Sequence, residues 1–319
     1  MKPALSIILF TTVSGAAQGM ALVIAVATLA GSAPQAATPL LLWASTAMLV
    51  LGLVASFFHL GHPLRAWRAV LMWRTSWMSR EVIALPLFIG LTFVSACLAT
   101  FGHFSGPSNG LSNGPFVSAL AVLTIIGAGV LWYCTAMIYM CIRFIQEWAH
   151  PLTLANFVLL GLASGLVACG VLACAAGDLN FARACAPWAL GATALAWGTR
   201  VLSLRRNARI KPKSTLQSAT GIRSPRVVQK SMGFTGGSFN TREFFHGASL
   251  RLMGQAKIGF QVLVFAVPMA CLAWALVSMH PLTAWAVAAA SQAVGLLVER
   301  WFFFAQAQHP QNLYYQVVS

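Results

Sequence analysis

The sequence predicts an all-α membrane protein, with eight transmembrane helices packed in one bundle. The chain has 319 residues, of which 59% are hydrophobic and 8% are charged, whereas about one quarter of the residues are charged in a typical soluble domain. Apolar runs of about 18 residues or more recur along almost the whole chain, and each is long enough to cross a hydrocarbon core of about 30 Å as a helix. The basic residues gather in alternate connections between these runs, which is typical of a polytopic membrane protein.

The apolar runs give the expected boundaries of the helices. We expect transmembrane helices over residues 4–30, 39–58, 80–101, 115–142, 152–176, 185–204, 257–279 and 282–305. Together they form a single membrane-anchor domain over residues 1–319, with one long basic loop at 205–256. The first run follows a single lysine and is longer than the core of a signal peptide, so we interpret it as a helix of the mature protein.

The basic residues predict the orientation. When the connections are assigned alternately to the two sides, every Lys and Arg except Arg183 falls on the side of the N-terminus. The positive-inside rule then predicts that both termini are cytoplasmic, in a bacterial inner membrane. A net charge of +15 would indicate nucleic-acid binding in a soluble domain. Here the charge follows the sides of the membrane, so we expect no nucleic-acid partner.

Individual spans carry features that bear on packing and function. The small residues from Ser14 to Gly19 in the first span allow a neighbouring helix to approach closely. Ser79 is the expected N-cap of the third span, which places Glu81 in the first helical turn. Glu299 and Arg300 in the last span are adjacent, and adjacent residues lie about 100° apart on a helix, so each is expected to need its own partner.

The 205–256 loop differs in composition from the rest of the chain. Its first part, residues 205–213, is strongly basic, and residues 234–247 are rich in aromatic side chains. A polybasic segment beside a helix end is attracted to anionic lipid headgroups by about 1 kcal/mol per basic residue. Docking of a partner subunit is the alternative interpretation. We expect the aromatic part to be ordered against another structure.

The cysteine and histidine positions do not favour a bound metal cofactor. The seven cysteines lie in or beside apolar segments and form no C-x-x-C motif, so we expect no iron–sulfur cluster in this chain. All seven histidines lie at span ends or in loops. A transmembrane haem needs paired histidines at depth on facing helices, so we expect no haem either.

Charged and titratable residues cluster between the second and third spans, from His59 to Glu81. Such groups are costly beside hydrocarbon and by default indicate a functional site. Oxidation of a lipophilic hydroquinone releases protons with the electrons, and a histidine together with a partly desolvated glutamate suits that chemistry. In the structural alternative, His59 stabilises a helix C-terminus, Glu81 stabilises an N-terminus, and the arginines bind phosphate headgroups.

Two other classes of membrane protein are alternatives to a quinol site. A secondary transporter more often shows inverted repeats, with helices broken near the midplane. We find no internal repeat, and the ionisable groups cluster at one face, which counts against transport. A purely structural anchor without a quinol site is the second alternative.

The same cluster carries a family resemblance. The run His59-Leu60-Gly61-His62-Pro63-Leu64-Arg65-Ala66-Trp67, followed by Ser79-Arg80-Glu81-Val82, resembles the H-L-G-x-P-x-R-A…S-x-E-[IV] block of the dimethyl sulfoxide (DMSO) reductase anchor subunit family. The eight-span layout and the late Glu299-Arg300 pair followed by aromatic residues are also similar. The resemblance covers nearly the full length, and its most specific part is residues 57–82.

The resemblance implies a membrane anchor that oxidises menaquinol or ubiquinol in anaerobic respiration. It also implies two partners, an iron–sulfur electron-transfer subunit and a molybdopterin catalytic subunit, so that the molybdenum is not in this chain. By position, His59 and Glu81 match the family's catalytic quinol-site residues, and Arg65 matches its arginine. The long 205–256 loop departs from the shortest family members and leaves the terminal substrate open. Further quinol-binding candidates on the same membrane side are Arg80, Glu299 and Arg300.

Overall fold

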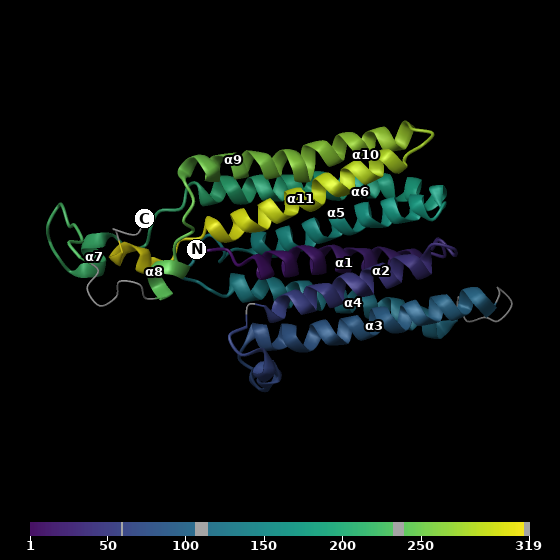
Figure 1. Cartoon of the computed structure of the whole chain (residues 1–319), viewed down its shortest axis with the longest axis horizontal. Coiled ribbons are helices and arrows are strands. Elements are labelled where there is room, and N and C mark those ends of the chain that lie inside the picture. The colour runs from purple at the N-terminus through teal and green to yellow at the C-terminus, as the bar shows by residue number, and fades with distance from the viewer. Residues whose placement is uncertain (59, 106–113, 232–238, 316–319) are drawn as a thin grey trace.

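The computed structural model describes residues 1–58, 60–105, 114–231 and 239–315. Over these residues the protein forms a bundle of long helices that run side by side (Figure 1). The N-terminus and the end of the described residues lie at the same end of the bundle, which we call the terminal end. The expected all-α helical bundle is therefore confirmed.

The long helices follow the expected spans. They are α1 (Leu5–Leu29), α2 (Thr38–Phe57), α3 (Trp77–Ser105), α4 (Pro115–Met140), α5 (Pro151–Ala175), α6 (Leu179–Asn207), the continuous run Leu250–Val277, and α11 (Leu282–Ala305). Among the described residues, seven of these have the length and apolar composition needed to cross a membrane. The eighth, α6, is 29 residues long and lies in the same bundle (Figure 1), but Arg200 lies within its most apolar stretch and lowers its hydropathy.

The run Leu250–Val277 is built from three pieces. These are α9 (Leu250–Gln261), a π-helical turn η4 (Val262–Ala266) and α10 (Val267–Val277). Pro268 is the second residue after the π turn. A proline has no N–H to donate within a helix and its ring clashes with the preceding turn, so a local change in helical pitch at this point has a covalent cause.

Short elements lie in the connections between the long helices and after the last one, at the terminal end. They are the 3₁₀ helix η1 (Pro63–Met72), α7 (Leu216–Thr220), α8 (Phe239–Glu243) and the 3₁₀ helix η5 (Pro310–Tyr314). The long loop is shorter than expected, because α6 continues to Asn207 and α9 already begins at Leu250. Ser249 explains the early start of α9, since its side chain accepts a hydrogen bond from the N–H of Leu252 and caps the helix.

The described part of the aromatic stretch is ordered, as expected. The ring of Phe244 stacks on His309 with centroids 3.8 Å apart. The Asn312 side chain donates a hydrogen bond of 3.1 Å to the Phe244 carbonyl, and the Tyr314 hydroxyl donates one of 2.8 Å to the Ala219 carbonyl. These contacts therefore pack the loop against the C-terminal segment. Residues 234–238 of this stretch lie outside the described residues.

The centre of the bundle is the contact between α1 and α5, where glycines replace larger side chains. A Cβ atom on Gly19 would lie 2.1 Å from the carbonyl oxygen of Gly161, and one on Gly165 would lie 2.3 Å from the carbonyl carbon of Gly19. Both helices carry a G-x-x-x-G spacing, Gly15 to Gly19 and Gly161 to Gly165. The expected close approach through small residues of the first span is confirmed.

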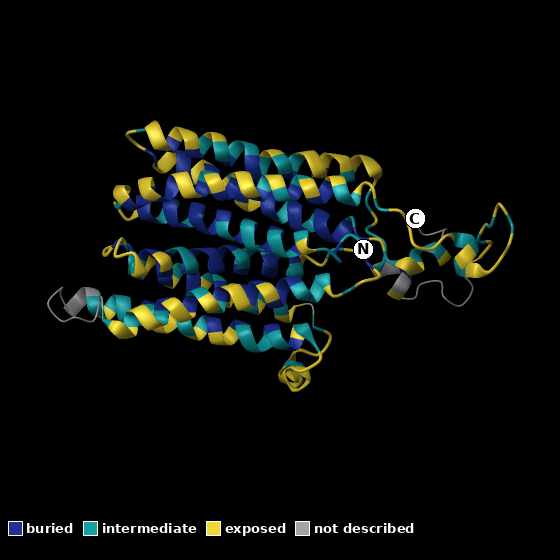
Figure 2. Cartoon of the chain, turned by 180° about the vertical axis from the view of Figure 1, so that it is seen from behind, coloured by how far each residue is buried: buried dark blue, intermediate teal, exposed yellow. Residues whose placement is uncertain are grey.

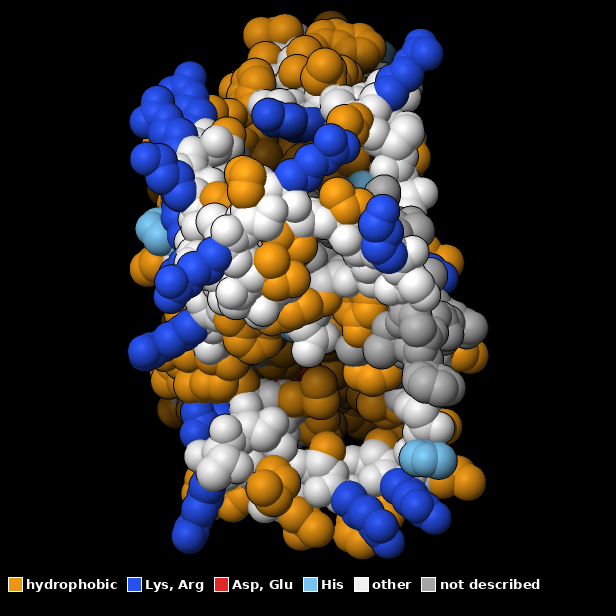
Figure 3. Space-filling view, turned by 90° about the vertical axis from the view of Figure 1, so that its left-hand side faces the viewer, with side chains coloured by type: hydrophobic (Ala, Val, Ile, Leu, Met, Phe, Trp, Pro, Cys, Tyr) orange, Lys and Arg blue, Asp and Glu red, His pale blue; other side chains and the backbone are white. Residues whose placement is uncertain are grey.

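The outer surface of the bundle is apolar, as a lipid-facing surface requires. Figure 2 shows buried residues on the inward sides of the helices and exposed residues on the outward sides. Large apolar side chains such as Trp188 and Leu195 are 73% and 63% exposed. The end-on view in Figure 3 shows many Lys and Arg side chains around the terminal end.

Candidate functional site

Glu81 lies at the terminal end of α3 and is buried. The helix begins at Trp77, because the Ser76 hydroxyl accepts a hydrogen bond from the N–H of Ser79 and so caps it. The expected N-cap at Ser79 was therefore wrong by three residues, and Glu81 is not in the first turn. Glu81 lies four residues inside the helix, about 6 Å from its start at 1.5 Å per residue. A capping role therefore does not explain why Glu81 is buried.

The Glu81 carboxylate is held from the neighbouring helix. The Thr135 hydroxyl of α4 donates a hydrogen bond to Oε1 of Glu81, between two buried residues. Among the residues that the structure describes, Glu81 forms no ion pair with an arginine, lysine or histidine. Burying a carboxyl group without a cationic partner costs free energy. Such a group in a membrane helix is therefore by default a candidate functional residue. Thr135 offers one neutral donor, which leaves the carboxyl group able to exchange a proton.

Tyr139 connects this carboxyl group with the last helix. It lies one turn beyond Thr135 on α4 and packs in an aromatic cluster, with ring centroids 5.7 Å from Phe157 and 5.6 Å from Phe303. The Arg300 guanidinium lies over the same two rings, 4.4 Å from the centroid of Phe157 and 5.3 Å from that of Phe303. The structure therefore brings the sequence-predicted residues of α3 and α11 to the same region, with Tyr139 between them.

Glu299 and Arg300 form a buried charge cluster with Arg200, which the sequence reasoning missed. Nε of Arg300 lies 2.5 Å from Oε2 of Glu299, and Nε of Arg200 lies 2.7 Å from Oε1. The three side chains are at most 4% exposed. The expectation that Glu299 and Arg300 do not face each other was wrong, because the long arginine side chain folds back along the helix to reach its neighbour. In the sequence, the position of Arg200 inside an apolar span was the signal that this cluster has a third member.

Aromatic rings surround the two guanidinium groups of this cluster. The Arg300 guanidinium lies 4.4 Å from the ring centroid of Phe157, and that of Arg200 lies 5.3 Å from Phe260. Nη2 of Arg200 is buried with no hydrogen-bond partner among the described residues, and its Nε is close to Glu299 but not aligned for a hydrogen bond. Cation–π contacts therefore replace part of the hydration that these charges lose.

The loop arginines lie outside this buried region. Nε and Nη2 of Arg80 donate hydrogen bonds of 2.9 Å to the carbonyls of Trp73 and Arg74, and its guanidinium lies 4.0 Å over the Trp77 ring. Arg80 therefore fastens the loop to α3, although it is adjacent to Glu81 in sequence. Arg65 is exposed on η1. His59, the other predicted catalytic residue, lies outside the described residues.

The 3₁₀ helix η1 presents an exposed apolar face next to an exposed basic one. Residues three apart lie above one another on a 3₁₀ helix, so Leu64, Trp67 and Val70 share one side. Leu64 is 93% exposed and Trp67 is 63% exposed. Arg65 and Arg68 share the adjacent side. The same segment carries the sequence block that resembles the anchor subunit family.

Comparison with known proteins gives two matches to this protein. Residues 1–212 match the model of the DMSO reductase anchor subunit (DmsC) family. The protein is also 44% identical over 331 residues to a sulfite dehydrogenase subunit of Allochromatium vinosum, and the match covers 100% of both proteins. The protein therefore belongs to the DMSO reductase anchor subunit family and is an anchor subunit of the molybdopterin oxidoreductase type.

Proposed function

We propose that this protein is the quinone-reactive membrane anchor of a molybdopterin oxidoreductase complex. In this proposal a lipophilic quinone or quinol binds at the terminal end of α3 and α4 and exchanges electrons with an iron–sulfur partner subunit, which is in turn connected to a molybdopterin catalytic subunit. The observation that carries the proposal is the buried Glu81 carboxyl group, held only by the Thr135 hydroxyl among the described residues. The proposed location is the bacterial inner membrane, with the terminal end facing the cytoplasm.

The name of the relative that matches over its full length supports one direction of electron flow. That relative is named as part of a sulfite dehydrogenase, and a dehydrogenase removes electrons from its substrate. Oxidation of sulfite with water gives sulfate, two protons and two electrons, and a quinone takes up two electrons and two protons to become a quinol. We therefore propose quinone reduction in this protein. Menaquinol oxidation, as in a DMSO reductase, is the reverse of the same half-reaction and uses the same groups.

Each residue of the proposed quinone site has a separate role in proton-coupled electron transfer. Glu81 delivers a proton to the quinone oxygen during reduction, or accepts it in the reverse direction. Thr135 orients the Glu81 carboxyl group, and the Tyr139 hydroxyl adds a polar group between Glu81 and Arg300. The buried cluster of Arg200, Glu299 and Arg300 carries one net positive charge, which favours the anionic forms that arise when electrons precede protons. Arg65, exposed on η1, stays a candidate from the sequence alone. His59 follows the end of α2 in the sequence and is proposed as the second hydrogen-bonding group.

The experiment is substrate-driven quinone reduction by the purified complex. We expect Glu81→Gln to lower the rate about 10²- to 10⁴-fold, the usual contribution of a general acid or base, and His59→Ala to lower it as well. Reduction of a water-soluble dye by the catalytic subunit bypasses the membrane site and should not change. Glu147→Gln removes another carboxylate at the terminal end and is the matched control.

The same assay decides between the proposed function and its alternatives. Full quinone activity in both Glu81→Gln and His59→Ala would contradict a quinone site at these residues. A wild-type complex that reduces the dye but not quinone would indicate a purely structural anchor. Comparing sulfite as electron donor with DMSO as acceptor in the same preparation decides the direction. Loss of dye reduction together with quinone reduction in Glu81→Gln would indicate a failure of assembly, and Glu81→Asp then tests whether a carboxyl group restores both.

A further inference from the structure

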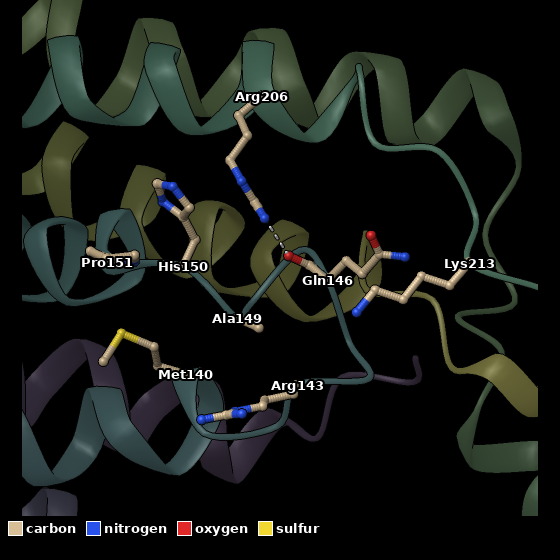
Figure 4. A pocket seen from close by; sticks show the side chains of 8 residues that line it. All are labelled: Met140, Arg143, Gln146, Ala149, His150, Pro151, Arg206 and Lys213. Carbon is tan, nitrogen blue, oxygen red and sulfur yellow. Dashed lines mark hydrogen bonds between the residues drawn. The ribbon is translucent and has the colours of Figure 1, made fainter.

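A second candidate site lies at the terminal end, and neither Glu81 nor Thr135 lines it. It is a pocket of about 470 Å³ between the end of α4, the start of α5 and the end of α6. Figure 4 shows cationic side chains from three segments around it: Arg143 from the α4–α5 connection, Arg206 from α6, and Lys213 from the loop that follows α6. His150 and Gln146 also line the pocket, and no acidic side chain among the described residues does.

One of the three cations is fixed in position. Nη2 of Arg206 donates a hydrogen bond of 2.9 Å to the Gln146 carbonyl, and Nη1 donates one of 2.9 Å to the Asn207 side chain. The Gln146 side chain donates in turn to the Lys211 carbonyl at 3.5 Å. These contacts tie the α4–α5 connection to the segment after α6. The pocket is therefore built by the fold before any ligand arrives, while Arg143 and Lys213 remain exposed at its edges.

The surroundings give the pocket a positive potential. The N-terminus of α5, at Pro151, contributes the positive end of a 25-residue helix. The N–H groups of Leu152 and Thr153 are already bonded to His150, so the cationic side chains are left to bind a ligand. Burial and the nearby Arg206 guanidinium lower the pKa of His150. Glu147, the nearest acid in sequence, does not line the pocket.

The pocket lies at the depth of lipid headgroups. Helix α5 has 25 residues, which at 1.5 Å per residue gives about 37 Å, more than the roughly 30 Å of a hydrocarbon core. Its first residues, which border the pocket, therefore fall in the headgroup layer. The apolar Met140 and Pro151 form part of the wall and suit the glycerol portion of a lipid beside its phosphate. This depth favours a lipid phosphate over an acidic protein segment.

We propose that this pocket binds the phosphate group of an anionic phospholipid, held by Arg143, Arg206 and Lys213. Basic pockets between helices on the cytoplasmic side of membrane proteins are suited to anionic headgroups. The site is separate from Glu81 and does not depend on the quinone chemistry. It gives the polybasic segment after α6 a defined role, because Lys213 and the contacts of Lys211 close one side of the pocket.

The test is binding of short-chain phosphatidylglycerol to the purified full-length protein in neutral detergent, followed by native mass spectrometry. The double variant Arg143→Gln, Lys213→Gln removes the two exposed cations and keeps the structural bonds of Arg206. We expect its dissociation constant to rise about 30-fold, from the usual contribution of two basic residues near a headgroup. The control double variant Arg223→Gln, Lys230→Gln removes the same charge from exposed positions outside the pocket and should bind as the wild type does.

The ligands in the titration separate the possible sources of the anion. Phosphatidylcholine should bind more weakly than phosphatidylglycerol, and inorganic phosphate should compete only at much higher concentration. Inorganic phosphate that binds as tightly as the lipid would overturn the assignment to a lipid. An equal loss of lipid affinity in both double variants, or no loss in either, would overturn the proposal that this pocket binds the lipid. So would unchanged lipid binding combined with release of the partner subunits from the purified complex, which would indicate protein docking.

Discussion

Arg200 on α6 and Glu299 on α11 place Nε and Oε1 2.7 Å apart, with both side chains at most 1% exposed. Arg300 completes the cluster from the other side of the carboxylate. Two guanidinium groups therefore share one carboxylate inside an apolar bundle. The cluster joins α6 to α11 and lies about 9 Å inside the end of α11, counting six residues at 1.5 Å each.

Removing the shared carboxylate should harm the fold more than removing one arginine. Glu299→Gln leaves two buried cations without a counter-ion, and the loss of one partner from a buried pair typically costs about 3–5 kcal/mol. Arg200→Met leaves one neutral Arg300–Glu299 pair and fills the space with an apolar side chain, so its cost should be smaller. Thermal unfolding in detergent measures the order. A more stable Glu299→Gln than Arg200→Met would contradict the description of this cluster.

The glycine contact between α1 and α5 predicts a position-specific loss of stability. Gly19→Ala places a methyl group against the Gly161 carbonyl, where the added Cβ would lie at 2.1 Å, so the two backbones must separate. Overpacking of this kind typically costs about 1–3 kcal/mol. Gly129→Ala on α4 is the matched control, since an added Cβ there meets nothing within 4 Å. Equal unfolding temperatures for the two variants would contradict the close packing.

The contact of His309 with Phe244 predicts a pH-dependent C-terminal segment. Burial lowers the pKa of His309 from its ordinary value of 6.5, and the pKa of His246 in the same region is lowered in the same direction. The docked segment therefore favours the neutral ring, and its stability is fully present above pH 6.5 and is lost as the pH falls through the lowered pKa. The protection factors of the η5 amides, which correct for the slower intrinsic exchange at lower pH, should decrease as the pH falls from about 7 to about 5. In His309→Gln the pH dependence should shrink, and an unchanged dependence would assign it to other groups.

The orientation of the bundle can be tested with reporter fusions. The terminal end carries the Lys and Arg residues of the long loop, so we expect fusions after Ser231 and after Tyr315 to report the cytoplasm. A fusion in the α10–α11 turn, at His280, should report the opposite side. Periplasmic signals from the first two fusions would reverse the proposed topology and with it the side on which the partner subunits dock.

Composition and spacing were sufficient to predict the bundle, because each apolar run has few alternatives to a membrane helix. They also predicted that Glu81 and the Glu299–Arg300 pair lie at the same end. Thr135 and Tyr139 could not be predicted, since a hydroxyl on a long helix becomes informative only when the register of neighbouring helices is known. The start of α3 was misplaced because Ser76 and Ser79 are both suitable caps, and three-dimensional contacts decide between them. Arg200 was counted with the other basic residues of the N-terminal side, although it lies inside the expected span 185–204, because its partner Glu299 belongs to a distant part of the sequence.

The most direct test of the quinone site is photolabelling of the purified complex with an azido-quinone, followed by mapping of the labelled peptides. The proposed site predicts adducts at the start of α3, near Glu81, or at the end of α4, near Thr135 and Tyr139. Labelling should be competed by quinone and should decrease in Glu81→Gln but not in Glu147→Gln. Adducts confined to the opposite end of the bundle, or labelling unaffected by Glu81→Gln, would contradict a quinone site at this carboxyl group.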